Sequence, residues 1–131
     1  MKHILLADDD QDDVEFFQEA LREVAADIHL TTVSNGIQLM HLLKEAKETF
    51  DLLVLDINMP LKNGFDCLQE IRSGPRFSLI PIALMSTSSD LEVRVKVTAL
   101  GANAFYTKPS EFDQLVALIR SLIVQNWNEV K

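Results

Sequence analysis

Residues 51–72 read DLLVLDINMPLKNGFDCLQEIR, and this stretch decides the fold. It begins with Leu52-Leu53-Val54-Leu55, which is apolar at four consecutive positions. Such a run is typical of a strand that helices cover on both faces, as in a parallel sheet. The stretch therefore predicts one strand–helix unit of an α/β protein, with Asp56 at the end of its strand.

Four more short apolar runs repeat this unit before and after it, at residues 4–7, 28–33, 80–85 and 104–106. Segments with apolar residues at helical spacing lie between the runs. The clearest helical segment begins at Phe112, with apolar side chains at i, i+3, i+4, i+7, i+10 and i+11. Five such units in 131 residues predict a doubly wound α/β fold with a five-stranded parallel sheet and right-handed crossovers.

One segment carries two conflicting patterns. Apolar residues alternate there with polar ones: Leu91, Val93, Val95 and Val97. A period of two favours a strand, but Ser89-x-x-Glu92 fits a helix capping box and Gly101 fits a helix end. A strand would also break the alternation of strands and helices. We expect a helix that its own sequence determines only weakly.

The composition predicts a single soluble globular domain, with 47% hydrophobic and 24% charged residues. No apolar run approaches the ~18 residues that a membrane span needs. The lone Cys67 excludes an internal disulfide and a cysteine-based zinc site, and suits a reducing compartment. The net charge of −8 argues against a nucleic-acid backbone as the main partner. We therefore expect a cytoplasmic protein that binds neither nucleic acid directly nor a membrane.

Polar side chains follow most of the predicted strands. Asp8 and Asp9 come after the first strand and Asp56 after the third, while Ser86 and Lys108 follow the fourth and fifth. Because the carboxyl ends of parallel strands meet at one edge of the sheet, we expect these side chains to converge there.

Three carboxylates at one edge raise one another's pKa unless a cation compensates their charge. All-oxygen ligands suit Mg²⁺, so the edge predicts a Mg²⁺-assisted phosphoryl-transfer site with a carboxylate nucleophile. Asp56 is the most informative of the three, because a charge at the end of a buried strand is costly without partners. The nearby Asp10, Asp12 and Asp13 are instead expected to begin a solvated helix, where acidic residues are favoured.

The polar residues fall into one combined pattern: Asp8-Asp9, then Asp56-x-Asn58-x-Pro60 with Gly64, then Ser86 thirty residues after Asp56, then Lys108-Pro109. This pattern resembles the receiver domains of two-component response regulators, and the resemblance spans essentially the whole chain. It implies a flavodoxin-like (βα)5 fold with strand order 2-1-3-4-5. It also implies a receiver domain at residues 1–127 and a C-terminal tail at 128–131.

The resemblance implies a role for each site residue. Asp56 would be the phosphoacceptor, and the Lys108 ammonium would pair with a phosphoryl oxygen. Mg²⁺ would be held by Asp8, Asp9 and Asp56 together with the backbone carbonyl of Asn58.

The resemblance also implies a switch. The hydroxyl of Ser86 would turn to the phosphoryl group, and Phe105 stands at the position of the family's switch aromatic. A phenylalanine there cannot donate an O–H bond, and Tyr106 belongs on the other face of its strand, so it does not take the role. A cis peptide bond would join Lys108 to Pro109.

These roles predict a stand-alone receiver that turns over no metabolite and catalyses only its own phosphorylation and dephosphorylation. Its phosphodonor would be a sensor histidine kinase or a histidine phosphotransfer protein. It would dock on a downstream protein through the face formed by residues 91–99, 104–106 and 112–123.

Four alternatives remain open at this point, and one of them is a nucleotide or flavin binder on the same fold. The chain could be a receiver excised from a longer regulator or hybrid kinase, although Met1 lies close to the first predicted strand. It could be a degenerate receiver that serves as a scaffold. It could also be a Mg²⁺-dependent aspartate-nucleophile phosphatase, but that class has a second aspartate where this chain has Asn58.

Overall fold

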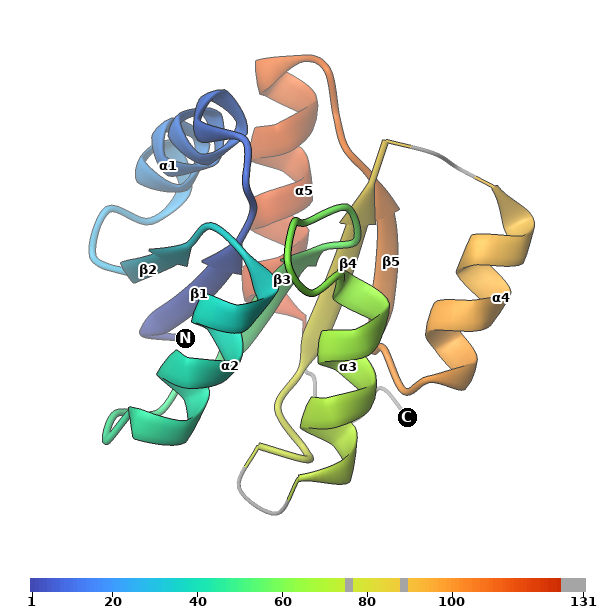
Figure 1. Cartoon of the computed structure of the whole chain (residues 1–131). Coiled ribbons are helices and arrows are strands. Elements are labelled where there is room, and N and C mark those ends of the chain that lie inside the picture. Colours follow the sequence, from blue (N-terminus) through green and yellow to red (C-terminus); the bar gives the residue numbers. More distant parts are fainter. Residues whose placement is uncertain (75–76, 88–89, 126–131) are drawn as a thin grey trace.

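Five parallel strands form one sheet in the computed structural model, which describes residues 1–74, 77–87 and 90–125. In chain order they are β1 (His3–Ala7), β2 (His29–Val33), β3 (Leu52–Asp56), β4 (Ile82–Ser86) and β5 (Ala104–Thr107). Across the sheet their order is β2-β1-β3-β4-β5 (Figure 1). The predicted fold class and strand order are confirmed, and each strand begins and ends within two residues of its apolar run. The predicted tail at 128–131 lies outside the described residues.

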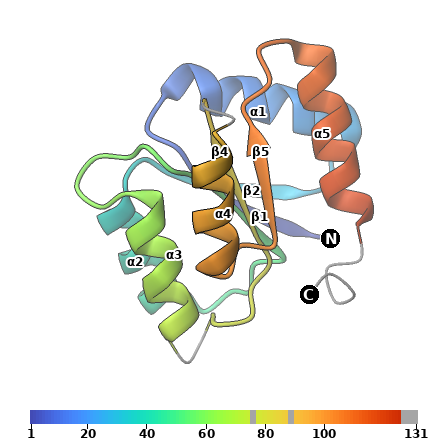
Figure 2. The same cartoon turned by 90° about the vertical axis from the view of Figure 1, so that its right-hand side faces the viewer.

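Helices cover both faces of this sheet. Within the described residues they are α1 (Gln11–Val24), α2 (Gly36–Glu45), α3 (Gly64–Ser73), α4 (Leu91–Ala99) and α5 (Phe112–Val124). The helices α1 and α5 lie on one face, and α2, α3 and α4 lie on the other (Figures 1 and 2). None of these helices has the length and apolar composition that crossing a membrane would require.

The core divides in the same way. Leu52 and Val54 of β3 pack in the cluster that includes α1 and α5, whereas Leu53 and Leu55 pack in the cluster of α2, α3 and α4. Successive side chains of a strand point to opposite faces of the sheet, so a strand between two helical layers must be apolar throughout. Because the whole of β3 is buried, Asp56 at its end is buried as well.

Residues 91–99 form the predicted helix, although apolar and polar residues alternate along them. The side chain of Asp90 caps α4 by accepting a hydrogen bond from the Glu92 N–H at 2.9 Å. Just beyond the helix, Gly101 has a φ of 101°, a conformation that favours glycine. The cap that the sequence predicts at Ser89 lies outside the described residues.

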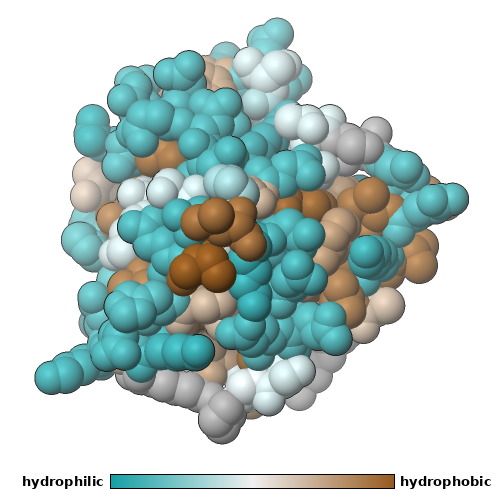
Figure 3. All heavy atoms as spheres, in the orientation of Figure 1, coloured by the Kyte–Doolittle hydropathy of each residue, from teal (hydrophilic) through white to brown (hydrophobic). Residues whose placement is uncertain are grey.

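The apolar residues of α4 do not form one buried stripe. Val97 is the only residue that is buried among those of α4, whereas Leu91 and Val95 are 70% and 61% exposed. In Figure 3, hydrophobic residues reach the surface on the side of the molecule where α4 lies. This helix is therefore attached to the core by few apolar contacts.

Candidate functional site

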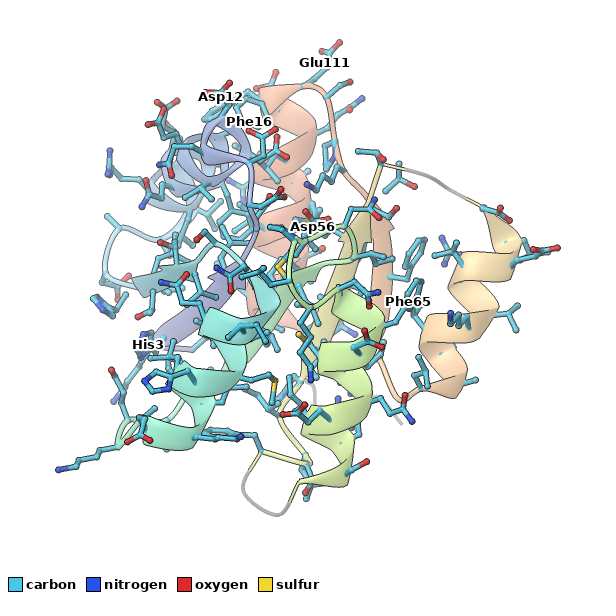
Figure 4. The ribbon with its side chains drawn as sticks, viewed as in Figure 1. His3, Asp12, Phe16, Asp56, Phe65 and Glu111 are labelled. Atoms are coloured by element: carbon cyan, nitrogen blue, oxygen red, sulfur yellow. The ribbon has the colours of Figure 1, made fainter. Side chains whose placement is uncertain are left out.

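The carboxyl ends of four strands bring the predicted site residues to one edge of the sheet. Asp8 and Asp9 follow β1, Asp56 ends β3, Ser86 ends β4 and Lys108 follows β5. Asp56 lies at this edge, where β3 runs into its loop before α3 (Figure 4). The edge is the place where a doubly wound sheet offers room for a ligand.

The three aspartates form a tight acidic cluster. One carboxylate oxygen from each of Asp8, Asp9 and Asp56 lies within 4.8 Å of the other two. Asp8 and Asp56 are buried, with 3% and 4% exposure, while Asp9 is exposed. The cluster has the all-oxygen donors and the negative charge that a divalent cation such as Mg²⁺ requires.

Burial makes the ionised forms of Asp8 and Asp56 costly. It raises the pKa of Asp56 to about 6, because the attraction of Lys108 only partly offsets the lost hydration and the charge of Asp8 adds to the cost. Burial also raises the pKa of Asp8, against the opposing effect of the Asp10 N–H, which donates to Asp8 Oδ1 at 3.0 Å. An added positive charge would stabilise the ionised forms of both carboxyls.

Lys108 supplies the positive charge of the cluster. Its Nζ lies 2.8 Å from Asp13 Oδ2, 3.1 Å from Asp8 Oδ2 and 3.3 Å from Asp56 Oδ2. Burial alone would lower the pKa of Lys108, but the hydrogen bond to Asp13 and the charges of Asp56 and Asp8 outweigh it and raise that pKa. Lys108 therefore stays protonated, and its ammonium lies next to all three of these carboxylates.

The contact with Lys108 corrects the interpretation of Asp13 as part of a merely solvated helix start. Asp10 does cap α1, since its side chain accepts hydrogen bonds from the Asp12 and Asp13 N–H groups at 2.9 and 3.3 Å. Asp12 is exposed, but Asp13 pairs with Lys108. Asp13 lies four residues before the buried Phe17, and this helical spacing is the signal that could have placed it on the inner side of α1.

The loop after β3 holds the carboxylate of Asp56 in place. The N–H of Asn58 donates to Asp56 Oδ1 at 3.2 Å, so Oδ2 faces Lys108. The N–H of Gly64 donates to the Ile57 carbonyl at 2.8 Å. A Cβ at Gly64 would lie 2.6 Å from the Asp56 carbonyl oxygen and 2.7 Å from the Ile57 Cα, so only glycine allows α3 to begin this close to β3.

The ends of β4 and β5 are joined beside the cluster. Ser86 is buried, and its backbone carbonyl accepts a hydrogen bond from the Lys108 N–H at 2.7 Å. The expected cis peptide bond between Lys108 and Pro109 is wrong, since no peptide bond among the described residues is cis. The trans form is the intrinsic preference of bonds that precede proline, and Lys108 reaches the cluster with this bond trans.

The two aromatic residues of β5 lie on opposite faces of the sheet, as the sequence predicts. Phe105 is 7% exposed and packs on the side of α4, where the Arg94 guanidinium carbon lies 5.2 Å from the centre of its ring. Tyr106 packs on the side of α1 and α5, and burial raises the pKa of its phenol. Phe105 is thus the aromatic residue that faces α4.

Comparison with known proteins identifies relatives along most of the chain. The family model for the response regulator receiver domain matches residues 4–120. Response regulator Rcp1 of Synechocystis sp. is 28% identical, over 92% of this chain and 86% of Rcp1. The probable transcriptional regulatory protein SilR of Salmonella typhimurium is 33% identical, over 92% of this chain and 50% of SilR. The chain spans about half the length of the transcriptional regulators that it matches.

Solved structures of response regulators superpose on the whole fold. The phosphorylated cyanobacterial phytochrome response regulator RcpA has a TM-score of 0.86 and 30% identity, over 99% of this chain and 96% of RcpA. The Mn²⁺-bound form of Rcp1 has a TM-score of 0.85 and 26% identity, over 100% of this chain and 98% of Rcp1. The similarity therefore includes all the strand ends that carry the acidic cluster and Lys108.

Proposed function

Because the chain belongs to the response regulator receiver domain family of two-component systems, we propose that Asp56 accepts a phosphoryl group and so switches a protein-docking surface. Receiver domains generally act as signalling switches rather than as enzymes with substrates of their own. The observation that carries the proposal is the buried Asp56 carboxylate at a strand end, with Asp8, Asp9 and Lys108 around it.

The proposed chemistry is nucleophilic attack by Asp56. One carboxylate oxygen forms a bond to the phosphorus of the donor, and the bond from phosphorus to the leaving group breaks. The leaving group is the imidazole nitrogen of a phosphohistidine, or acetate when the donor is acetyl phosphate. A pKa of about 6 leaves the carboxyl mostly ionised, and hence nucleophilic, at neutral pH. The Lys108 ammonium pairs with an oxygen of the transferred group.

We assign the cation site to Asp8, Asp9 and Asp56, with the backbone carbonyl of Asn58 as a further ligand. Bound Mg²⁺ supplies the positive charge that lets a phosphoryl dianion approach these carboxylates. The spacing of the three carboxylates and the raised pKa values of Asp8 and Asp56 support this assignment. A Mn²⁺-bound structure of Rcp1, a similar protein, is consistent with it.

The proposed switch connects Asp56 to α4 and β5. The Ser86 hydroxyl turns to the phosphoryl group, and Phe105 moves in the space beneath β5. The output face is formed by α4, β5 and α5, and the exposed Leu91 and Val95 of α4 offer it apolar contacts. A docking protein would bind the phosphorylated arrangement of this face more tightly than the unphosphorylated one.

We propose that residues 1–127 act as a cytoplasmic receiver domain, with 128–131 as a tail. Its partners are a sensor histidine kinase or histidine phosphotransfer protein and a downstream target protein, rather than nucleic acid or a membrane. The match to Rcp1, a response regulator, along 92% of this chain supports the assignment of these residues as a receiver domain.

Acetyl phosphate tests the proposed phosphoacceptor directly. With Mg²⁺ it should add one phosphoryl group to the wild type and none to Asp56→Asn, because an amide is not a competent nucleophile for this transfer. Intact-mass spectrometry measures the adduct, and Asp12→Asn is the matched control because Asp12 is exposed and outside the acidic cluster. Equal labelling of the wild type and Asp56→Asn would overturn the assignment.

A further inference from the structure

The three carboxylate partners of Lys108 differ in what else they are required to do. Asp8 and Asp56 belong to the acidic cluster that we assign to the cation, and Asp56 is also the proposed nucleophile. Asp13 is neither a member of this cluster nor the nucleophile, and it lies in the first turn of α1. It nevertheless makes the shortest of the three contacts, at 2.8 Å to Nζ.

A cation and an ammonium compete for the same carboxylate oxygens. When Asp8 and Asp56 turn to a divalent cation and a phosphoryl group, their contacts with the ammonium weaken. Asp13 is then the remaining carboxylate acceptor among the three. An ammonium has three N–H donors, so one bond to Asp13 leaves two donors for the phosphoryl oxygens.

Asp13 is itself well fixed. Its N–H donates to the capping side chain of Asp10, and α1 is held to the sheet by the buried Val14 and Phe17. Apolar side chains, including Phe16 and Leu115, line the same small pocket as Asp13 and Lys108. A charge-assisted hydrogen bond is stronger beside such apolar surface than in open water.

We infer that Asp13 is a positioning residue, which holds the Lys108 ammonium at the phosphoryl site while Asp8 and Asp56 engage the cation. This inference rests on the proposed phosphorylation of Asp56. Through it, the first turn of α1 takes part in the chemistry although it contributes no ligand and no nucleophile.

The test compares two alanine variants in the same helical turn. Asp13→Ala should slow phosphorylation by acetyl phosphate at saturating Mg²⁺ by about fivefold to thirtyfold, the range that 1–2 kcal/mol represents. Asp12→Ala removes an equal charge from the same turn and should change the rate by less than about twofold, because Asp12 is exposed on that turn. Asp13→Asn keeps an acceptor oxygen and should recover part of the rate.

Lys108 itself provides the second readout. Its ammonium ¹H–¹⁵N signal, assigned by its loss in Lys108→Met, should shift in Asp13→Ala and stay in place in Asp12→Ala. In the Lys108→Met background, Asp13→Ala should have no further effect on the phosphorylation rate, since the partner through which Asp13 acts is gone.

The possible failures are distinguishable. An unlabelled wild type would overturn the proposed function. A labelled wild type with equal rates for Asp13→Ala and Asp12→Ala would overturn the role of Asp13 alone, as would an effect of Asp13→Ala that persists without Lys108.

Discussion

Asp56 combines two properties that oppose each other. Its burial at the end of β3 raises the pKa to about 6, so the ionised carboxylate destabilises the folded chain at neutral pH. The same burial keeps the carboxylate poorly hydrated and next to Lys108, as a nucleophile for phosphoryl transfer needs. Under the proposed function, the site therefore gives up some stability of the fold for reactivity at Asp56.

This conflict predicts that Asp56→Asn stabilises the protein in the absence of Mg²⁺. A carboxyl whose pKa is raised by folding destabilises the folded state most at pH values above that raised pKa. This destabilisation shrinks as the pH falls toward 3.8, the pKa of the carboxyl in the unfolded chain. The variant should raise the free energy of unfolding by about 1–3 kcal/mol at pH 7.5, and by about half as much at pH 5.

Denaturant unfolding at the two pH values, with a chelator present, measures this difference. Burial lowers the pKa of His3, and that shift destabilises the fold as the pH drops below 6.5. His3 is present in both proteins, so its contribution cancels in the comparison. A gain that is the same at both pH values would show that the charge of Asp56 is not its source.

At the scale of elements, α4 differs from the other helices in how it is attached. Val97 is the buried side chain of α4, and two cations on the helix lie over aromatic rings. Arg94 covers Phe105 of β5, and Lys96 Nζ lies 4.1 Å from the centre of the Phe65 ring on α3. Such contacts are worth about 0.5–2 kcal/mol each and tolerate displacement, so α4 is the helix best suited to move.

Val97 and Val95 give a matched test of this attachment. Val97→Ala leaves a cavity in the core and should lower the free energy of unfolding by about 1–3 kcal/mol. Val95→Ala removes the same atoms from a side chain that is 61% exposed and should change stability by less than about 0.5 kcal/mol. Denaturant unfolding measures both variants, and equal losses would mean that α4 is anchored in another way.

At the scale of the whole molecule, the sequence predicts the fold more completely than the site. Alternating apolar runs and helical segments are enough to predict five strands and their parallel arrangement, because the three central strands, β1, β3 and β4, are buried along their whole length. The pairing of Asp13 with Lys108 depends on which face α1 turns to the sheet. The acidic composition of the helix start does not reveal that face, whereas the helical spacing from Asp13 to the buried Phe17 indicates it. The bond before Pro109 is trans, which is the usual form before proline, whereas the cis form is implied by the resemblance alone.

The proposed switch joins these scales. A phosphoryl group on Asp56 would gain one charge-assisted hydrogen bond from Ser86, which is worth roughly 1.5–3 kcal/mol, or about ten- to a hundredfold in an equilibrium. That energy is enough to shift a chain that already samples two arrangements of α4 and β5. It is too small to build a new fold, so the sheet and the other helices should stay as they are.

Hydrogen exchange with beryllofluoride, a phosphoryl mimic that binds at the acceptor aspartate, tests the central claim most directly. With Mg²⁺ and beryllofluoride, amide exchange in the wild type should change most in residues 86–108, which include α4 and β5. Asp56→Asn should show no such change under the same conditions. A response centred on α1 and α2, or the same response in Asp56→Asn, would contradict the proposal that chemistry at Asp56 is transmitted to α4 and β5.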